Sequence, residues 1–193
     1  MQPHLHPAAW DPLVLMRECE VLHKRVRGPG GQRRNKVESA VEIRHTPTGL
    51  HGSAHERREQ VQNHRVALFR LRVNLALELR YPADPALPPS ELWQSRVTEP
   101  RQVALPSNQP LGNLGKPFPA ATGRIAANPE HHDFPALLAE ALDVIETCNY
   151  DLSDAARWLL VSPSQLGKFL ALEPRAMHRV NQQRQLRGLK AWK

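Results

Sequence analysis

The apolar residues in the first 80 positions are spaced as in a small domain that ends in a long helix. Between residues 57 and 80 they recur at intervals that fit one face of a helix, and the opposite face carries Arg65, Arg72 and Arg80. The apolar positions are Val61, Leu68, Leu71, Leu75 and Leu79. The pattern predicts a helix with an apolar side toward a core and a basic side toward solvent.

Shorter elements precede this helix. Asp11 and Pro12 are typical of a helix start, and we expect a short helix that reaches about residue 18. One strand is predicted over 19–26, and a second around 41–44, where apolar and charged residues alternate. Residues 46–49 indicate a turn with proline at its second position, followed by a further hairpin strand. Residues 1–80 are therefore predicted to form an α+β domain, a short β-sheet with a long C-terminal helix.

A proline-rich stretch follows this domain. Ten of the eighteen prolines fall within residues 81–129. Proline lacks a backbone N–H and fixes φ, so this density excludes a long helix or a central strand. We interpret residues 81–129 as an extended connector, in which Leu92, Trp93 and Val97 are placed to dock on a neighbouring domain.

Residues 130–193 are predicted to form a small all-α module with a basic tail. Apolar residues have helical spacing over 134–145, and Asp151 or Ser153 fits the cap of a short second helix. Ser162 and Pro163 fit the N-cap and first turn of a third helix. The expected architecture of the whole chain is therefore α+β for residues 1–80 and all-α for the C-terminal module.

The pattern Ala-Ala-x-x-Leu-x-Val-Ser-x-x-x-Leu at 155–166 resembles a helix-turn-helix of bacterial DNA-binding proteins. Leu160 stands where that motif prefers glycine, and only Gln165 and Lys168 are polar candidates for reading bases. Because the preceding helix is acidic and only the tail is basic, we favour a three-helix packing or ribosome-docking module over a module that reads DNA.

The net charge and its distribution predict a polyanionic partner for the chain. The 193 residues carry a net charge of +7, and residues 1–80 hold 14 Lys and Arg against 8 Asp and Glu. A second basic patch covers residues 157–193, with eight bases and one acid. With an isoelectric point near 10.0, nucleic acid is the expected partner, ahead of an anionic membrane, because no amphipathic lipid-binding pattern accompanies the charge.

Other function classes are disfavoured by what the sequence lacks. No apolar run approaches the length of a membrane helix, and the first residues do not read as a secretory signal, so we expect a cytoplasmic protein without a membrane partner. Two cysteines and ten scattered histidines show no ligand spacing. We therefore expect no metal and no cofactor.

The segment 27–35 contains the most distinctive chemistry. Its glycines allow the backbone to lie flush against a ligand, so that peptide N–H groups can stabilise a developing negative oxygen. Gln32 adds an amide that donates and accepts without titrating. Cationic side chains that could hold phosphates surround it: Arg25, Arg27, Arg33, Arg34 and Lys36. Composition alone favours a flexible glycine hairpin with solvated charges.

A longer pattern favours the catalytic interpretation. Gly-Pro-Gly-Gly-Gln-x-x-Asn-Lys-Val-x-Ser spans 28–39, His-x-Pro-Thr-Gly spans 45–49, and Arg-x-Gln-x-x-Asn spans 58–63. Together they resemble the GGQ catalytic domain of class I peptide chain release factors and their codon-independent rescue relatives. The resemblance covers about residues 15–79. It implies an enzyme that hydrolyses the peptidyl-tRNA ester in the ribosomal peptidyl-transferase centre, with water as nucleophile.

The resemblance also implies roles for individual residues. Gly30, Gly31 and Gln32 match the catalytic tripeptide, and Gln32 matches the site that a glutamine N5-methyltransferase modifies. The supporting positions, expected to bind RNA with the surrounding cations, are Asn35, Lys36, His45, Arg58, Gln60 and Asn63. In the tail we expect RNA contacts from Arg184, Arg187, Lys190 and Lys193. The chain departs from the family at Glu59, where serine is usual, and at the basic pair 33–34.

The subclass is predicted from the position of the tripeptide. Only 29 residues precede Gly30, fewer than a codon-reading domain needs. We therefore expect no stop-codon reading. The chain instead resembles the short relatives that release peptides from stalled ribosomes or large subunits, and this resemblance implies large-subunit rRNA and peptidyl-tRNA as partners. We also expect a monomer. The alternative is a non-catalytic RNA- or DNA-binding regulator that uses the helix-turn-helix-like module.

Overall fold

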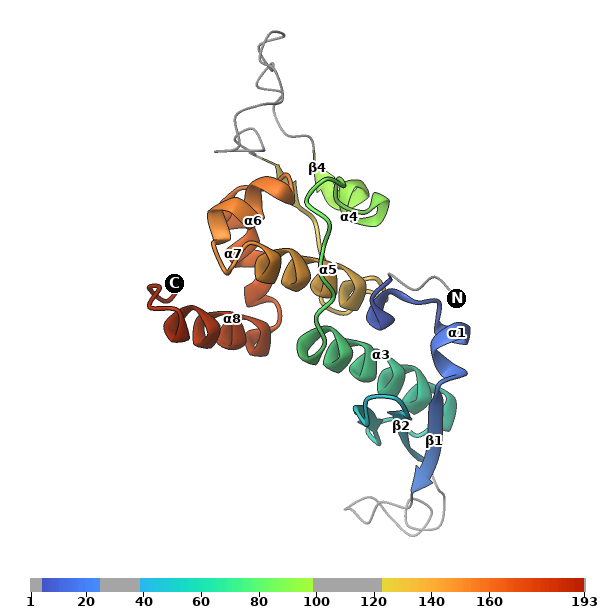
Figure 1. Ribbon diagram of the computed structural model, residues 1–193. Helices are drawn as coiled ribbons and strands as arrows, with labels where there is room; N and C mark the ends of the chain where they lie inside the picture. Colours follow the sequence, from blue (N-terminus) through green and yellow to red (C-terminus); the bar gives the residue numbers. More distant parts are fainter. Residues whose placement is uncertain (1–4, 25–38, 99–122, 193) are drawn as a thin grey trace, which may run out of the picture. The chain divides into compact units, whose positions relative to one another are not determined.

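The computed structural model describes residues 5–24, 39–98 and 123–192. The chain divides into two compact units, Met1–Leu79 and Arg80–Lys193 (Figure 1). The elements of unit 1 are η1 (Pro7–Ala9), α1 (Pro12–Met16), β1 (Cys19–Lys24), β2 (Ala40–His45), β3 (His51–Ala54) and α3 (Gln60–Glu78). Those of unit 2 are α4 (Glu91–Arg96), β4 (Val97–Thr98), β5 (Arg124–Ile125), α5 (Phe134–Thr147), α6 (Leu152–Trp158), α7 (Pro163–Ala171) and α8 (Pro174–Leu186). This mixture of helices and small antiparallel sheets agrees with the expected α+β class.

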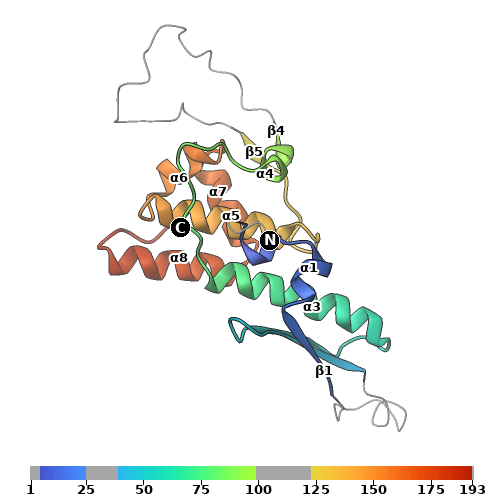
Figure 2. The same ribbon diagram turned by 45° about the vertical axis from the view of Figure 1, so that its right-hand side comes forward.

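Unit 1 is a three-stranded antiparallel sheet with α3 along one face (Figure 2). The strand order is β1-β2-β3, and Ile43 in the centre pairs with Val21 on one side and Gly52 on the other. Alternate residues of β2 are buried, as the period-2 pattern predicts. The expected turn is also present, with Gly49 at a φ of 72°. The short helix α1 begins as predicted, because the Asp11 carboxylate accepts a hydrogen bond from the Leu13 N–H at 2.8 Å.

Close contact between β3 and α3 depends on Gly52. A Cβ at this position would lie 2.2 Å from the Ala67 carbonyl oxygen and 2.3 Å from the Leu71 nitrogen. Both neighbours are helix backbone, which cannot move aside without distorting α3. The absence of a side chain at Gly52 therefore sets how near the sheet lies to the helix that covers it.

The faces of α3 differ from the prediction at two positions. Val61 is 64% exposed, whereas Arg72 is only 7% exposed. The Arg72 Nε–H donates to the Ala8 carbonyl at 2.9 Å, because η1 packs against α3 on this side. The sequence pattern assigned Arg72 to solvent because it did not include this N-terminal segment as a packing partner.

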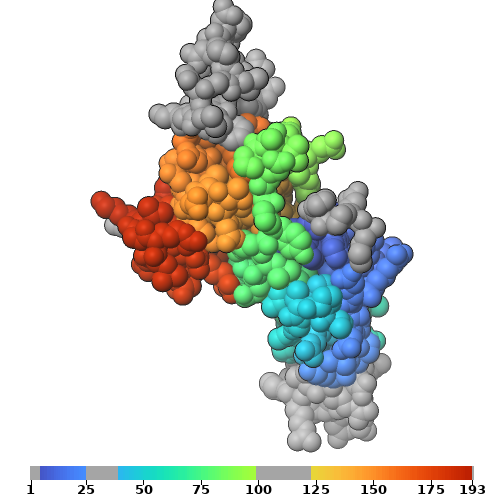
Figure 3. Space-filling view, viewed as in Figure 1, coloured from blue at the N-terminus to red at the C-terminus, as the bar shows by residue number. Residues whose placement is uncertain are grey.

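Unit 2 incorporates part of the stretch that we interpreted as a connector. Ser90 caps α4 by accepting the Trp93 N–H at 3.0 Å, and Trp93 itself is completely buried. Its indole Nε1–H donates to the Leu159 carbonyl at 2.7 Å. Its ring packs edge-on against the Phe169 ring, with 5.4 Å between the ring centroids. Figure 3 shows α4 lying against the surface of the C-terminal helices. The proline pattern did not predict a helix in this stretch, although Trp93 is one of the residues expected to dock.

The predicted helix starts of the C-terminal module are confirmed. The Asp151 carboxylate accepts from the Ser153 N–H at 2.8 Å and opens α6, while the Ser162 hydroxyl accepts from the Gln165 N–H at 3.3 Å and opens α7. Leu160, in the turn between these helices, has a φ of 59°. This left-handed conformation favours glycine, so the leucine there is strained.

Asp143 makes the stability of unit 2 dependent on pH. Burial raises the pKa of its carboxyl from 3.8 to about 7. Between these values the folded chain binds a proton that the unfolded chain does not, so this group's contribution to stability falls as pH rises. We expect Asp143→Asn to raise the free energy of unfolding more at pH 8 than at pH 5. The difference between its effects at the two pH values should be on the order of 2 kcal/mol. Urea unfolding of both proteins at each pH measures this, and an equal effect at both pH values would contradict it.

Candidate functional site

The predicted catalytic tripeptide lies outside the described residues, but its two flanks are visible. Gly30, Gly31 and Gln32 belong to the segment 25–38, as do Arg25, Arg27, Arg33, Arg34, Asn35 and Lys36. The described chain stops at Lys24 and resumes at Ser39, and Lys24 pairs with Ala40 across β1 and β2. The two ends of the segment therefore meet at one end of the sheet.

Asn63 supports this end from inside the protein. Its side chain has no exposed surface, and its amide donates to the Ser39 carbonyl at 2.6 Å and to the Arg57 carbonyl at 2.9 Å. The amide oxygen accepts the Arg57 N–H at 2.9 Å. The Asn63 side chain is thus engaged inside unit 1, and its expected RNA contact stays a prediction.

His45 is likewise internal. It is 2% exposed, its Nδ1 lies 2.8 Å from the Thr48 hydroxyl, and its Nε2 lies 3.4 Å from a Glu18 carboxylate oxygen. The ring therefore holds the turn after β2 to the start of β1. The side chain offers almost no surface, and the expected RNA contact of His45 stays a prediction.

Gln60 and Arg58 are exposed, in keeping with a surface role. The Gln60 Nε2 lies 2.7 Å from His23 Nδ1 near the end of β1. Glu59, the departure from the family pattern, is exposed and accepts from the Gln62 amide at 2.9 Å. Arg57 and Arg58, just before α3, and Arg65, within it, are also exposed.

In unit 2, two tail arginines have partners within the protein. Arg184 donates to the Tyr150 carbonyl, and its Nε–H donates to the Lys190 carbonyl at 2.9 Å. The Arg187 guanidinium lies 4.4 Å from the centre of the Tyr150 ring. Both arginines thus stabilise the turn after α5, where Asn149 and Tyr150 have positive φ angles. The expected RNA contacts of both arginines stay predictions, as does that of Lys190, which is exposed, and Lys193 lies outside the described residues.

The end of the described tail is docked rather than solvated. The Trp192 N–H donates to the Asn181 amide oxygen at 2.6 Å, and the Asn181 amide donates back to the Trp192 carbonyl at 2.9 Å. A Cβ on Gly167 would lie 2.5 Å from the indole nitrogen of Trp192. Trp192 therefore packs directly on the backbone of α7.

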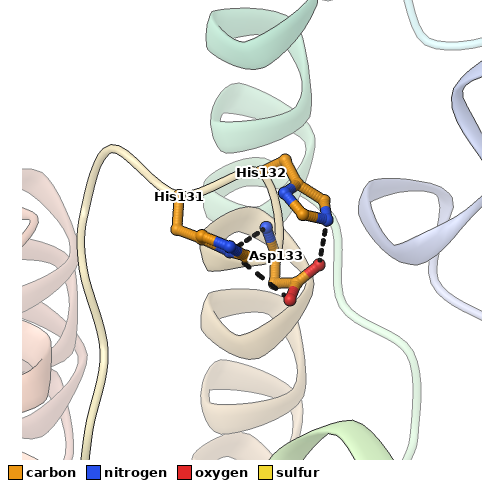
Figure 4. Close-up of side chains that lie close together, drawn as sticks. All are labelled: His131, His132 and Asp133. Atoms are coloured by element: carbon orange, nitrogen blue, oxygen red, sulfur yellow. Dashed lines mark hydrogen bonds and ion pairs between the residues drawn. The ribbon is translucent and has the colours of Figure 1, made fainter.

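A cluster of potential metal ligands that the sequence analysis missed stands before α5 (Figure 4). His132 Nε2 lies 2.9 Å from one Asp133 oxygen, while His131 Nδ1 lies 3.4 Å from the other. Arg96 occupies that second oxygen at 2.7 Å, and the Asp133 N–H donates to His131 Nδ1 at 3.3 Å. The guanidinium would repel a metal cation, so these contacts indicate an ion-pair cluster and not a metal site.

A cavity of about 340 Å³ adjoins this cluster. Its lining is Arg96, Ala126, Ala127, Asn128, His131, Phe134 and Leu137.

Among the described parts of the chain, no helix is both long enough and apolar enough to cross a membrane.

Comparison with known proteins identifies the fold of the first part of the chain. Residues 13–95 match the family model of the RF-1 domain. A mitochondrial peptide chain release factor-like protein of Saccharomyces cerevisiae is 46% identical over 50 residues, which cover 26% of this chain and 32% of that protein. Peptide chain release factor PrfB1 of Arabidopsis thaliana chloroplasts is 43% identical over 58 residues, 30% of this chain and 13% of the relative.

A third relative extends the same picture. Mitochondrial peptide chain release factor 1 of Bos taurus is 37% identical over 70 residues, 36% of this chain and 16% of the relative. The chain thus spans at most about a third of the length of these relatives. Their organellar names leave the expected cytoplasmic location a prediction. Residues 13–95 therefore match the RF-1 domain, and in this part the chain is similar to class I peptide chain release factors.

Proposed function

We propose that the chain releases nascent peptides by hydrolysing the peptidyl-tRNA ester on the ribosome without reading a codon. The observation that carries this proposal is an RF-1 domain whose sequence contains an intact Gly30-Gly31-Gln32. Release factors are named for a role in translation termination, and the chain shares their domain. Stalled ribosomes or large subunits are the proposed substrates, with large-subunit rRNA and peptidyl-tRNA as partners.

The proposed chemistry needs few groups from the protein. A water molecule attacks the ester carbonyl, and the backbone N–H of Gln32 stabilises the negative charge that develops on oxygen. The Gln32 amide shapes the pocket without acting as a strong base, since it does not titrate. Gly31 leaves room for the backbone to approach the ester. The remaining catalysis is assigned to ribosomal RNA, and no metal or cofactor is required.

The exposed arginines and the sheet of unit 1 support this role. Arg57, Arg58 and Arg65 are exposed before and along the first part of α3, and exposed guanidinium groups are suited to bind phosphates. The sheet and α3 hold the ends of β1 and β2 in a fixed register.

We also propose that the protein acts as a monomer. Gln32 is further proposed as a substrate for a glutamine N5-methyltransferase. The modification would replace one hydrogen with a methyl group and add about 14 Da to the peptide that contains Gln32.

Codon independence has a direct test. Because the proposed activity reads no codon, we expect similar rates of peptide release from stalled ribosomal complexes whether the A site holds a stop codon, a sense codon or no codon. Similar here means within about threefold, which corresponds to about 0.6 kcal/mol in activation free energy. Single-turnover release of labelled peptide measures it. A strong preference for a stop codon would overturn the rescue assignment while leaving the hydrolase assignment intact.

A nucleic-acid-binding regulator is the second candidate. The observation that favours it is the left-handed Leu160 in the turn between α6 and α7, at the position where helix-turn-helix motifs prefer glycine. On α7, Ser164 and Lys168 are exposed, whereas Gly167 is covered by Trp192. Salt-dependent binding to RNA or DNA in a chain that releases no peptide would favour this alternative.

A further inference from the structure

The two edges of the sheet in unit 1 differ in how their backbone groups are bonded. β1 forms one edge (Figure 2) and β3 the other. In an antiparallel ladder, residues that bond the neighbouring strand alternate with residues whose N–H and carbonyl point outward. The Thr46 N–H donates to the Glu18 carbonyl at 2.9 Å, and the His45 N–H donates to the Leu50 carbonyl at 2.8 Å. These two bonds fix the alternation along both ladders.

The helix α3 covers the edge formed by β3. The outward-pointing groups of this strand belong to His51 and Ser53. The Asn74 amide donates to the His51 carbonyl, and the Arg70 guanidinium donates to the Ser53 carbonyl, each at 2.7 Å. Because both carbonyls already have donors, this edge is closed to another strand.

The edge formed by β1 is open. Its outward-pointing groups belong to Cys19, Val21 and His23. No group in the part of the chain that the structure describes bonds the backbone N–H or carbonyl of Val21 or His23. Proline and bulges commonly protect an edge strand, but β1 contains no proline and pairs with β2 residue for residue. The sheet therefore has one edge that can accept a further strand.

The side chains on the open face of β1 are complementary to a second copy of themselves. Side chains alternate between the two faces of a strand, so Glu20, Leu22 and Lys24 share the face away from α3, and all three are exposed. If two β1 strands pair antiparallel with Leu22 opposite Leu22, each Glu20 lies opposite the partner's Lys24. The same register places Val21 opposite the partner's His23, and each such pair exchanges two backbone hydrogen bonds.

Other antiparallel registers are less favourable. They place Glu20 opposite Leu22 or a second Glu20, or they place Lys24 opposite Leu22 or a second Lys24, and like charges directly opposite each other are destabilising. Within one chain Glu20 already lies opposite Arg44. The partner's Lys24 would therefore extend a row of alternating charges across the two sheets.

We propose that the β1 edge is a homodimerisation surface, at which two copies of the chain pair their β1 strands antiparallel around Leu22 and join their sheets. The occupant is a second copy because β1 itself supplies the complementary charges. The contact is small, so we expect a reversible dimer with a dissociation constant on the order of 10–100 µM. The proposal concerns the free chain and does not rest on the proposed hydrolase function, in which the chain acts on the ribosome as a monomer.

The first experiment uses two charge-reversal variants of the full chain. Glu20→Lys and Lys24→Glu each place like charges opposite each other in the homodimer, so each variant alone should dimerise about 10- to 30-fold more weakly than the wild type. An equimolar mixture of the two variants restores both pairs of opposite charges in the heterodimer. It should therefore dimerise within about threefold of the wild type, as measured by sedimentation velocity between about 5 and 500 µM protein.

Glu130→Lys is the matched control for these variants. It makes the same change of charge at an exposed residue of unit 2 and should leave the dissociation constant unchanged. A wild-type chain that stays monomeric at the highest concentration would overturn the proposal. A mixture that dimerises no more tightly than either variant alone, or variants that dimerise like the wild type, would overturn it as well.

Amide hydrogen exchange tests the register in the wild-type chain and remains decisive if a charge variant does not fold. The Val21 and His23 N–H groups become bonded only in the dimer. Their exchange should therefore slow about three- to sevenfold between about 5 and 500 µM protein, in proportion to the loss of monomer. The Ser53 N–H, which points outward at the β3 edge, is the internal control and should not respond. Unchanged exchange at Val21 and His23, or equal slowing at Ser53, would contradict pairing through β1.

Discussion

Replacing Gln32 with alanine is expected to lower peptide release at least about tenfold while ribosome binding stays near the wild-type value. In the proposed mechanism the side chain contributes to the transition state more than to the ground state, so its loss should affect the rate and not the affinity. Gly31→Ala should lower release further, by about 100- to 1,000-fold, because in this mechanism a Cβ would obstruct the close approach of the Gln32 N–H to the oxyanion. Single-turnover release at saturating protein measures both effects.

The control variant for this prediction lies on α3. Gln62→Ala removes an exposed glutamine that hydrogen-bonds only to Glu59 among the described residues, and it should release peptide at the wild-type rate. A binding titration with each variant separates loss of affinity from loss of rate. Wild-type release by both Gln32→Ala and Gly31→Ala would refute the hydrolase assignment.

Replacing Trp93 with alanine is expected to destabilise unit 2 by about 3–5 kcal/mol, the usual cost of deleting a large buried aromatic side chain. Trp93 has no exposed surface, and its indole satisfies the Leu159 carbonyl just before the strained Leu160. Alanine would leave a cavity beside Phe169 and an unpaired carbonyl. Urea unfolding followed by circular dichroism measures the loss.

Leu92→Ala is the matched comparison for Trp93→Ala. Leu92 lies on the same short helix but is only partly buried, so its truncation should cost much less, about 1 kcal/mol or below. Equal effects of the two substitutions would mean that α4 does not complete the core of unit 2. The stretch would then behave as the connector that the prolines suggested.

Local signals in the sequence predicted the elements whose cause is local. Asp11, Asp151 and Ser162 begin helices because their side chains accept backbone N–H groups a few residues ahead. The alternation along β2 and the turn at Gly49 depend on neighbouring residues in the same way. In contrast, the prolines on either side of α4 concealed a helix whose stability comes from Trp93 and its distant partners.

Residue type alone could not show which site residues face outward. Asn63 and His45 match positions of the family pattern, yet both are buried and bind other parts of unit 1. Arg184 resembled a solvated tail cation, but the carbonyl of Tyr150, 34 positions earlier, lies within its reach. Such roles depend on contacts between residues far apart in the chain, which one sequence without its fold does not contain.

The docking of Trp192 has a consequence for how the protein is made. All partners within unit 1 have been synthesised once residue 79 is complete, so that unit can fold while the rest of the chain is still being translated. Unit 2 must wait, because Gly167 and Asn181 receive Trp192 only when it has emerged. The RF-1 sheet and its helix would therefore be in place before the helical unit closes, and premature arrest of synthesis would yield a folded first unit with an incomplete second one.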